Sequence, residues 1–297
     1  MRRFSKNMSV SEGQFMADDR GAARILVAAN AERSSIRVVT YNIHACVGVD
    51  RRYDPGRIAA VLREISADIA CLQEVGVRRG TKLQGDQAAY LAEATGCQVI
   101  LGPDPRGHRG RFANAILTRF PVAAARAIDL AVSDYEPRAA LDAELTIGDR
   151  TLRVLATHFG LHAGERRLQA NRLIGVLGEP SDPYHRAERA VLLVGDLNEW
   201  RGRSGGIRAL DRCLGPSAAR PTFPSWMPVL PLDRIYADGP AVLRNVHVYR
   251  SQLARLASDH LPLVGSLWWT DGQAGRREQG RILRWRTGSG LGAGAND

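Results

Sequence analysis

The chain has 297 residues, of which 44% are hydrophobic and 24% charged, which is the composition of an ordinary soluble globular protein. Its longest apolar runs, such as Leu261–Trp269, fall far short of the ~20 residues of a membrane span, and its four cysteines show no C-x-x-C spacing, so a transmembrane protein and a disulfide or zinc scaffold are excluded. The formal net charge of +10 indicates attraction to polyanions in general, but among the 41 basic residues only Lys6 and Lys82 are lysines, and a bias toward arginine explains the charge about as well.

Residues 1–35 show no sustained hydrophobic periodicity, and we predict that they form a flexible extension. From Ile36 onward, short runs of β-branched and aliphatic residues bounded by Gly, Pro and Asp predict strands. These runs cover residues 36–41, 69–72, 98–101, 115–118, 141–147, 152–157, 191–194, 232–236, 242–248 and 261–267. Residues 36–269 are therefore predicted to form the folded, catalytic domain, and residues 270–297 a basic, disordered tail.

Helices are predicted between some of these strands. Asp54-Pro55 places a carboxylate cap before a proline at the first helical position, and apolar residues follow at helical spacing up to Ile65. Two further helices are predicted over residues 86–94 and 164–177. In the second, the predicted apolar side comprises Leu168, Leu173, Ile174 and Leu177, and the solvated side Arg166, Arg167 and Arg172. Consecutive strands mixed with strand–helix steps predict an α/β protein of two packed sheets flanked by helices.

Polar residues follow several predicted strands, where open α/β sheets build their sites. Asn42 and His44 follow the first strand in Tyr-Asn-Ile-His, Glu74 ends the next in Leu-Gln-Glu, and His158 ends another in Thr-His-Phe. Each has an ordinary structural explanation, because a lone glutamate after a strand is usually a solvated cap and a single histidine is more often a hydrogen-bonded structural group. Taken alone, these segments decide little.

Three later segments carry more information. In Gly195-Asp196-Leu197-Asn198 a buried strand delivers an acid and an amide two residues apart, so both side chains point the same way if the strand continues. The alternative is an Asx-type turn. Asp233 follows in Leu-Asp-Arg, and Asp259-His260 stands in Ser-Asp-His-Leu-Pro, which alone is compatible with a turn. The six segments together, in this order, indicate a site.

This ordered set resembles the endonuclease/exonuclease/phosphatase (DNase I-like) superfamily, which includes nucleases, abasic-site endonucleases, neutral sphingomyelinases and inositol-polyphosphate phosphatases. The resemblance covers residues 36–268; Asn-Ile, Gln-Glu and Thr-His are weak motifs, Gly-Asp-x-Asn is moderately specific and Ser-Asp-His-x-Pro is strong. It implies a four-layer α/β/β/α sandwich of two packed mixed sheets flanked by helices, with the site at one end of the sheets. The implied activity is that of a divalent-metal-dependent phosphodiesterase.

The resemblance implies that Glu74 binds the metal, with Asn42 and Asp259 beside it. Oxygen ligands of this type suit Mg²⁺ or Mn²⁺ better than zinc. His44 occupies the position where abasic-site endonucleases carry an acidic metal-site residue, which argues against that branch.

The resemblance also assigns roles in catalysis. Asp196 matches the residue that activates or orients the attacking water, and Asn198 the residue that holds this water or a phosphate oxygen. His260 should contact the phosphoryl group, with Asp233 fixing its ring and favouring the charged form. His158 matches the other polar position on the phosphate side. This set supplies what a phosphodiester requires, namely an oriented water and donors for the developing charge beside a cation.

Two further segments, residues 112–117 and 136–141, are similar to family segments. They make Asn114 and Arg138 candidate contacts to the substrate phosphate. A strand-edge amide and a surface arginine explain these two residues about as well.

The substrate stays open between two classes. Inositol-polyphosphate phosphatases follow Gly-Asp-x-Asn with an arginine and carry Trp two residues before the matching Asp-Arg, whereas here Glu199 and Trp200 follow and Trp226 stands well ahead of Asp233. The pattern looks most like bacterial members named only by the superfamily. Nucleic acid is favoured by the basic balance and by Arg-rich residues 106–111. A phospholipid headgroup is favoured by residues 281–286, whose Arg and Trp suit peripheral contact with an anionic membrane.

A catalytically inactive binding module on the same fold is the alternative from a different class, and it is disfavoured because a dead copy has no chemical reason to keep every motif residue. The basic start Met1-Arg2-Arg3 is followed by polar residues rather than an apolar run, so no cleavable signal is expected. We expect a cytoplasmic monomer.

Overall fold

The computed structural model describes residues 35–76, 86–103, 112–178, 189–202, 204–217 and 219–270. The predicted N-terminal extension up to residue 34, the Arg-rich residues 106–111 and the tail beyond Thr270, with residues 281–286, lie outside the described residues. Within the described parts of the chain, no helix is long and apolar enough to cross a membrane.

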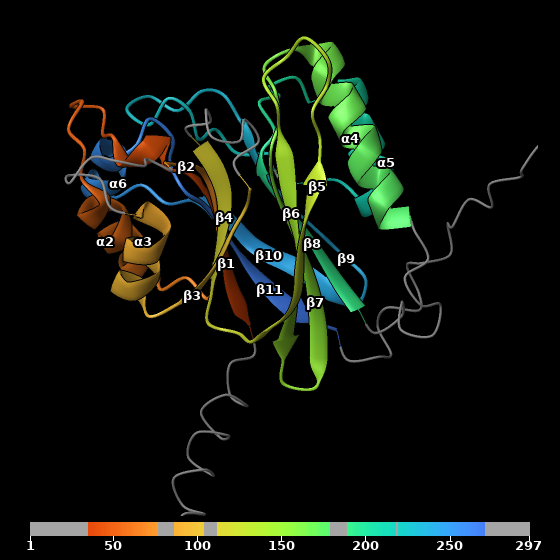
Figure 1. Ribbon diagram of the computed structural model, residues 1–297, viewed down its shortest axis with the longest axis horizontal. Helices are drawn as coiled ribbons and strands as arrows, with labels where there is room; N and C mark the ends of the chain where they lie inside the picture. Colours follow the sequence, from red (N-terminus) through yellow and green to blue (C-terminus); the bar gives the residue numbers. More distant parts are fainter. Residues whose placement is uncertain are drawn as a thin grey trace, which may run out of the picture. The chain divides into compact units, whose positions relative to one another are not determined.

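Two mixed β-sheets pack against each other (Figure 1). The first has the order β10-β11-β1-β2-β4-β3 and consists of β1 (Ile36–Asn42), β2 (Ile69–Gly76), β3 (Gln98–Leu101), β4 (Phe112–Thr118), β10 (Ala241–Val248) and β11 (Leu263–Trp269). Strand β1 is parallel to β2 and antiparallel to β11. The β1–β2 register sets Asn42 opposite Gln73, one residue before Glu74, so both candidate metal ligands lie at the same end of the sheet.

The second sheet has the order β5-β6-β7-β8-β9. Its strands are β5 (Val122–Asp129), β6 (Ala139–Ile147), β7 (Arg150–His158), β8 (Arg189–Asp196) and β9 (Asp233–Asp238). Strand β7 is parallel to β8, and β8 is antiparallel to β9. The register places Asp196 opposite His158 on one side and opposite Asp233 on the other, so these three residues lie in one row across three strands.

Helices cover the outer face of each sheet (Figure 1). On the first sheet lie α2 (Pro55–Ile65), α3 (Gln87–Thr95) and α6 (Gln252–Ala257), and on the second lie α4 (Ala163–Gly178) and α5 (Gly205–Leu214). One buried apolar cluster joins the two sheets, and one lies between each sheet and its helices. The predicted four-layer α/β/β/α sandwich is confirmed, and each buried Leu, Ile or Val contributes about 1.5–3 kcal/mol to its stability.

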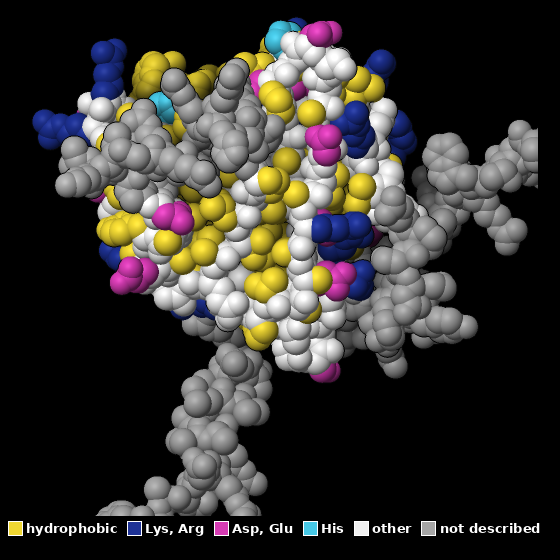
Figure 2. Space-filling model, in the orientation of Figure 1, with side chains coloured by type: hydrophobic (Ala, Val, Ile, Leu, Met, Phe, Trp, Pro, Cys, Tyr) yellow, Lys and Arg dark blue, Asp and Glu magenta, His cyan; other side chains and the backbone are white. Residues whose placement is uncertain are grey.

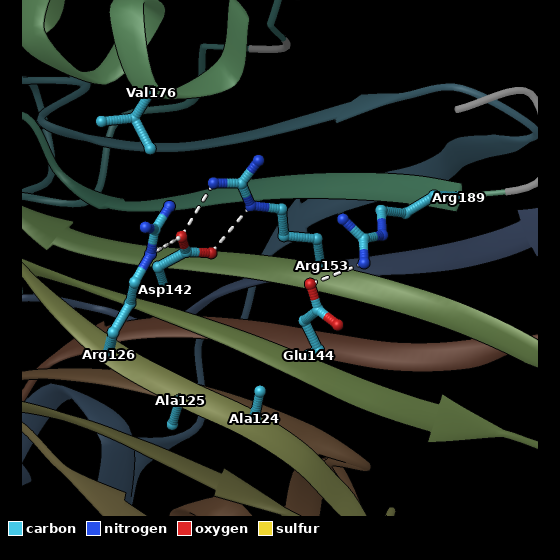
Figure 3. A pocket seen from close by; sticks show the side chains of 8 residues that line it. All are labelled: Ala124, Ala125, Arg126, Asp142, Glu144, Arg153, Val176 and Arg189. Carbon is cyan, nitrogen blue, oxygen red and sulfur yellow. Dashed lines mark hydrogen bonds and ion pairs between the residues drawn. The ribbon is translucent and has the colours of Figure 1, made fainter. Parts of the chain in front are cut away.

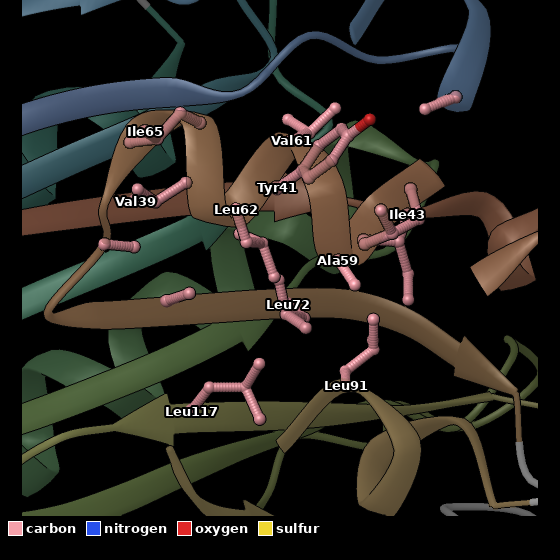
Figure 4. Close-up of a cluster of buried hydrophobic side chains, with 14 of the residues drawn as sticks. Val39, Tyr41, Ile43, Ala59, Val61, Leu62, Ile65, Leu72, Leu91 and Leu117 are labelled. Carbon is pink, nitrogen blue, oxygen red and sulfur yellow. The ribbon is translucent and has the colours of Figure 1, made fainter. Parts of the chain in front are cut away.

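Helix α2 shows how the sequence produces these layers. The Asp54 side chain accepts a hydrogen bond from the Arg57 amide (3.3 Å), and Pro55 occupies the first turn, as predicted. The apolar residues of the predicted stripe, Ile58, Val61, Leu62 and Ile65, are at most 4% exposed. They belong to the buried cluster that includes Val39, Leu72 and Leu117 of the first sheet, and Figure 4 shows Leu62 pointing from the helix toward Leu72.

Three elements were not predicted. Strand β5 contains four alanines and is exposed along most of its length, so it shows neither β-branched content nor alternation. As an edge strand it needs only one partner, β6. Helices α5 and α6 are short, but both begin with a serine cap, Ser204 and Ser251, whose hydroxyl accepts a hydrogen bond from an amide three residues on. Those caps were the available signal.

The predicted faces of helix α4 are partly wrong. Leu168 is 46% exposed, whereas Glu165, Arg166 and Gln169 are buried. The reason is that this helix supports two loops by polar contacts: the Arg166 guanidinium donates to Glu199 Oε2 (2.9 and 3.2 Å), and Gln169 Oε1 accepts from the Gly160 amide (2.9 Å). Periodicity of apolar residues cannot reveal a buried face built from paired polar groups.

Apart from the row of predicted site residues, a group of charged residues lies on the outer face of the second sheet, around a cavity of about 340 Å³ (Figure 3). Asp142 accepts two hydrogen bonds from Arg153 (both 2.8 Å) and one from Arg126 (2.9 Å), and Glu144 pairs with Arg189 at 2.6 Å. We call these five residues the Asp142 cluster. Arg153 lies five residues before His158 in β7, so this cluster is well separated along the strands from the row of predicted site residues.

Candidate active site

The ends of β1 and β2 bring Asn42 and Glu74 together. The pairing of β2 with β4 shifts by one residue between Leu72 and Val75, and Glu74 lies in this bulge with φ 56°. A bulge redirects a side chain that regular alternation would send elsewhere. Here the Asn42 amide nitrogen donates to Glu74 Oε1 at 3.0 Å.

Backbone strain is concentrated at this end of the sheets. Nine described residues other than glycine have positive φ, and five of them belong to or adjoin the predicted site: His44, Ala45, Cys46, Glu74 and Asn198. Each such conformation costs on the order of 1–3 kcal/mol and persists only where the surrounding structure enforces it. Strain of this kind is typical of functional sites.

Asp196 lies at the centre of the arrangement and is 1% exposed. Its Oδ2 accepts a hydrogen bond from Asn42 Nδ2 (3.1 Å), which joins the two sheets, while Oδ1 accepts from the Asn198 amide (2.9 Å). His158 Nε2 and His260 Nε2 each lie 3.6 Å from Oδ2. The two sheets therefore contribute to one polar centre, with two imidazoles beside the same carboxylate oxygen.

Gly195 is required for this alignment. A Cβ atom at this position would overlap the carbonyl oxygen of Thr157 in the neighbouring strand β7. Only glycine lets β8 approach β7 closely enough to place Asp196 next to His158.

His260 is held as a cation. Its Nδ1 donates to Asp233 Oδ2 (2.9 Å), and the same oxygen accepts from the Thr222 hydroxyl (2.5 Å). Burial alone would lower the pKa of His260, but the charges of Asp233 and Asp196, together with the hydrogen bond, outweigh burial and raise the pKa to about 10. The ring is therefore an imidazolium at neutral pH, as predicted from Asp233. Thr222 was not predicted, because a threonine in a loop eleven residues before Asp233 carries no sequence signal that it contacts Asp233.

His158 is neutral by contrast. Burial lowers its pKa to about 3, and the positive charges of Arg138 and His260 act in the same direction against the charge of Asp196. Its two ring nitrogens also face groups that can only donate, Arg138 Nη1 (3.3 Å) and Asn198 Nδ2 (3.0 Å). Two donors disfavour a protonated ring. The same carboxylate thus has one charged and one neutral histidine beside it.

Asp259 and His44 lie at the open side of the site. The Ser258 hydroxyl donates to the Asn42 carbonyl (2.7 Å), which fixes the segment before β11 to the end of β1. Asp259 is half-buried, with His44 Nδ1 at 3.9 Å from its Oδ1. Burial raises the pKa of Glu74, and the charges of Asp259 and Asp196 raise it further. Glu74 therefore lies close enough to Asp259 and Asp196 for their negative charges to affect it.

The negative charge of this site is poorly compensated within the described residues. No Lys or Arg there forms an ion pair with Glu74, Asp196, Asp233 or Asp259, and the cation in direct contact is His260. Asp196, Asp233 and His260 offer ligand atoms within 4.8 Å of one another, but His260 is charged and its Nδ1 already bonds Asp233. Buried carboxylates in this number require cations. A divalent cation with a preference for oxygen suits the carboxylates of Glu74 and Asp259. Asn42 lies beside them, but its Nδ2 faces Glu74 and Asp196 and its Oδ1 accepts a hydrogen bond from the His44 amide (3.1 Å).

The two candidate phosphate contacts lie in different settings. Arg138 reaches the site, with Nη1 at His158 and Nη2 at Glu136 Oε2 (3.2 Å), and its buried Nε has no partner among the described residues. Asn114 donates through Nδ2 to the Ala139 carbonyl (2.8 Å), which links β4 of one sheet to β6 of the other. The structure thus brings Arg138 to the centre, while one hydrogen of the Asn114 amide serves the contact between sheets.

Comparison with known proteins decides the family. The model of the endonuclease/exonuclease/phosphatase family matches residues 39–260. The chain belongs to this family. Its members hydrolyse phosphoester bonds and generally use divalent metal ions. Among curated proteins, the chain is 30% identical over 255 residues to the uncharacterized protein YbhP of Escherichia coli K12, which covers 80% of this chain and 97% of that protein.

Solved structures of the family share the fold. The endonuclease/exonuclease/phosphatase from Beutenbergia cavernae superposes with a TM-score of 0.63 at 24% identity, covering 80% of this chain and 72% of that one. The human Nocturnin catalytic domain with bound sulfate anion gives 0.63 at 20% identity, covering 80% and 96%. A mannosyl-6-phosphatase from Bacteroides thetaiotaomicron gives 0.61 at 17% identity, covering 79% and 100%. At these identities the likeness establishes the fold alone.

Proposed function

We propose that this family member is a divalent-metal-dependent phosphodiesterase in which Asp196 activates the attacking water. The observation that carries the proposal is the convergence on Asp196 Oδ2 of an amide from the first sheet and two imidazoles, one charged and one neutral. A buried carboxylate that is surrounded by donors, and that no arginine in the described parts of the chain neutralises, is suited to orient a water molecule and accept its proton.

The metal would be held mainly by the carboxylates of Glu74 and Asp259, whose oxygen donors and excess negative charge fit Mg²⁺ or Mn²⁺, with Asn42 beside them. When bound there, such a cation neutralises charge on the phosphate and makes phosphorus more open to attack. The contact of Asn42 with both Glu74 and Asp196 supports placing the cation and the water next to each other.

On the other side, His260 is the donor for the developing negative charge. Its ring is charged because Asp233 holds Nδ1, which leaves Nε2–H directed toward Asp196 and the reacting group. Asn198 is the positioning residue for the water or a phosphate oxygen, since its left-handed backbone and its bond to the Phe159 carbonyl (2.9 Å) fix its amide. Both roles match those implied by the sequence motifs.

His158 and Arg138 are proposed as the phosphate-side pair. Neutral His158 lies between Arg138 and Asn198, and the unpartnered Nε of Arg138 is a buried donor that a phosphate oxygen would satisfy. Asn114 is a weaker candidate, because only its second amide hydrogen is free to reach a substrate.

Hydrolysis of bis-p-nitrophenyl phosphate tests the proposal. Wild-type protein should turn over this diester with Mg²⁺ or Mn²⁺ and lose activity in EDTA, and Asp196→Asn should be slower by roughly a thousandfold or more. Asp149→Asn, at an exposed turn, is the matched control and should behave as wild type. Mono-p-nitrophenyl phosphate should be the poorer substrate. Unchanged turnover in Asp196→Asn would remove the assignment, and a complete lack of hydrolysis in wild type would favour the inactive binding module.

A further inference from the structure

Exposed apolar side chains are gathered around the candidate active site. Of the twelve large hydrophobic residues that are exposed in the described parts of the chain, seven lie in segments adjoining the strand ends that carry the site. These are Val49, Tyr135, Leu161, Trp200, Trp226, Met227 and Val229. Single exposed apolar residues need no explanation, but a concentration around one opening indicates contact with a partner.

The strongest part of this rim is the segment 222–230, which we call the Trp226 loop. Trp226, Met227 and Val229 are 64%, 52% and 56% exposed. The surrounding residues 221–232 contain no charged side chain and no histidine. A solvent loop is normally rich in polar residues, so an uncharged loop with a Trp-Met-Pro-Val tip is unusual on a surface that faces only water.

The Trp226 loop is fixed to the catalytic residues. The Ser225 amide donates to the Asp259 carbonyl (2.7 Å), the Leu261 amide donates to the Thr222 carbonyl (2.9 Å), and the Phe223 ring lies 4.9 Å from the ring of His260. The Thr222 hydroxyl also bonds Asp233. Because its base is built into the site, whatever the tip contacts is held in a defined position relative to the reacting groups.

The chemistry of the tip selects the kind of partner. Trp can stack on a nucleobase, but Met and Val offer no flat face, and a loop that follows nucleic acid needs cations for the phosphates. Trp beside aliphatic residues suits the boundary between lipid headgroups and acyl chains. On the face drawn in Figure 2, the Arg side chains at the right lie beside Asp and Glu side chains rather than forming one continuous basic field.

Cations stand at the base of the loop rather than at its tip. Arg255 Nη1 donates to the carbonyls of Ser225 (3.2 Å) and Trp226 (3.3 Å), and exposed Arg220 precedes the loop. In a separate segment, Arg201 lies over the ring of exposed Trp200. An apolar tip with arginines behind it matches acyl chains below and anionic headgroups above.

We propose that the Trp226 loop inserts Trp226, Met227 and Val229 into the surface of an anionic phospholipid membrane. Insertion would place the headgroup layer at the opening of the site, and that consequence, unlike the binding itself, rests on the proposed phosphodiesterase function. The inference therefore deepens the function by naming the surface on which the substrate is met.

Vesicle binding tests the proposal without any turnover. Full-length protein is sedimented with vesicles of phosphatidylcholine alone or mixed with phosphatidylglycerol, and stronger binding is expected on the mixed vesicles. The triple variant Trp226→Ser, Met227→Ser, Val229→Ser should partition at least about tenfold more weakly. The double variant Tyr90→Ser, Leu168→Ser removes exposed apolar residues from helices α3 and α4 instead and should bind as wild type.

A second measurement locates the contact. Lipids brominated in the acyl chains should quench tryptophan fluorescence of the wild type, and Trp226→Phe should keep vesicle binding but lose most of this quenching. The proposal is overturned if wild type does not bind the mixed vesicles, if the triple variant binds as wild type, or if a single-stranded oligonucleotide rather than vesicles quenches Trp226. Asp196→Asn should still bind vesicles, so a failure of the chemistry is distinguished from a failure of the membrane contact.

Discussion

Asp142 and Asp196 are buried carboxylates of the second sheet, 6% and 1% exposed, which lie on strands β6 and β8 with β7 between them, but they have different partners. Asp142 accepts three hydrogen bonds from the guanidinium groups of Arg153 and Arg126 (Figure 3). Asp196 pairs with no arginine of the described residues and instead contacts two imidazoles, an amide and a backbone N–H. The backbone around Asp142 is regular strand, whereas Glu74, Asn198 and residues 44–46 near Asp196 have positive φ.

The difference in partners between Asp142 and Asp196 indicates different roles for the two groups of residues. Burial acts to raise the pKa of Asp142, but the hydrogen bonds and charges of its two arginines lower it below its ordinary value, so its charge is satisfied inside the protein. Around Asp196 the acids outnumber the cations among the described residues. A cluster compensated by the chain stabilises the fold, while one left short of cations and held under strain is available for ligands and chemistry.

After Asp196→Asn, the largest effect on turnover is expected for Asp233→Asn. Without the Asp233 charge, burial dominates and the pKa of His260 falls from about 10 toward neutrality, so the ring loses its proton in the working range. Turnover of a diester should decrease roughly 100- to 1000-fold at neutral pH. The alkaline limb of the pH–rate profile should also move to lower pH. If the profile does not move, His260 does not act as the charged donor.

The next effect is on stability and not on turnover. Asp142→Ala leaves the nearly buried Arg153 guanidinium without its carboxylate, and the free energy of unfolding should fall by about 3 kcal/mol. Urea denaturation measures this change, and diester hydrolysis should stay within about twofold of wild type at a temperature where the variant is folded. Asp196→Asn should give the reverse result, with turnover lost and stability kept or raised. A loss of stability in both variants would mean that the two clusters do not differ as argued.

Metal ions are expected to bind at the Asp196 site and not at the Asp142 cluster, and thereby to stabilise the folded protein. A ligand that binds the folded state at about 100 times its Kd adds about 2.7 kcal/mol, so Mg²⁺ or Mn²⁺ should raise the melting temperature and EDTA should reverse the rise. Glu74→Gln should abolish this response, because it removes a carboxylate from the proposed ligand set. Asp142→Asn is the matched control and should melt lower but respond fully. An equal response in Glu74→Gln would place the ion elsewhere, with the Asp196, Asp233 and His260 group as the next candidate.

Much of this could be predicted from the sequence because it rests on local patterns. Helix α2 followed from Asp54-Pro55 and its apolar stripe, and the row of Asp196, His158 and Asp233 follows from strand ends that parallel and antiparallel pairing then align. The pattern of strands and strand–helix steps indicated two packed sheets flanked by helices, and the family resemblance specified the four-layer sandwich with the site at one end of the sheets.

What could not be predicted depends on contacts between distant segments. The bulge that turns Glu74 toward Asn42 arises from pairing with β4, and the buried polar face of α4 depends on Glu199, thirty-three residues after Arg166. The opposite protonation of His158 and His260 likewise comes from burial and neighbours that only the fold assembles. Strand β5 was missed because its alanines fit an exposed edge as well as they fit a helix.

The smallest effect distinguishes the two arginines that bind Asp142. The Arg126 side chain is 59% exposed and that of Arg153 is 7% exposed, so Arg126→Gln should lower the free energy of unfolding by only about 0.5 kcal/mol, and by less at high salt.

The pKa of Asp142 is lowered in the folded protein, so stabilisation by its arginines is present above the pKa of the unfolded chain and is lost as pH falls through the folded value. The difference between wild type and Arg126→Gln should therefore be full at pH 7 and vanish in acid. Denaturation at both pH values measures it, and a difference that persists in acid would show that Arg126 acts by packing its alkyl chain rather than through the charge of Asp142.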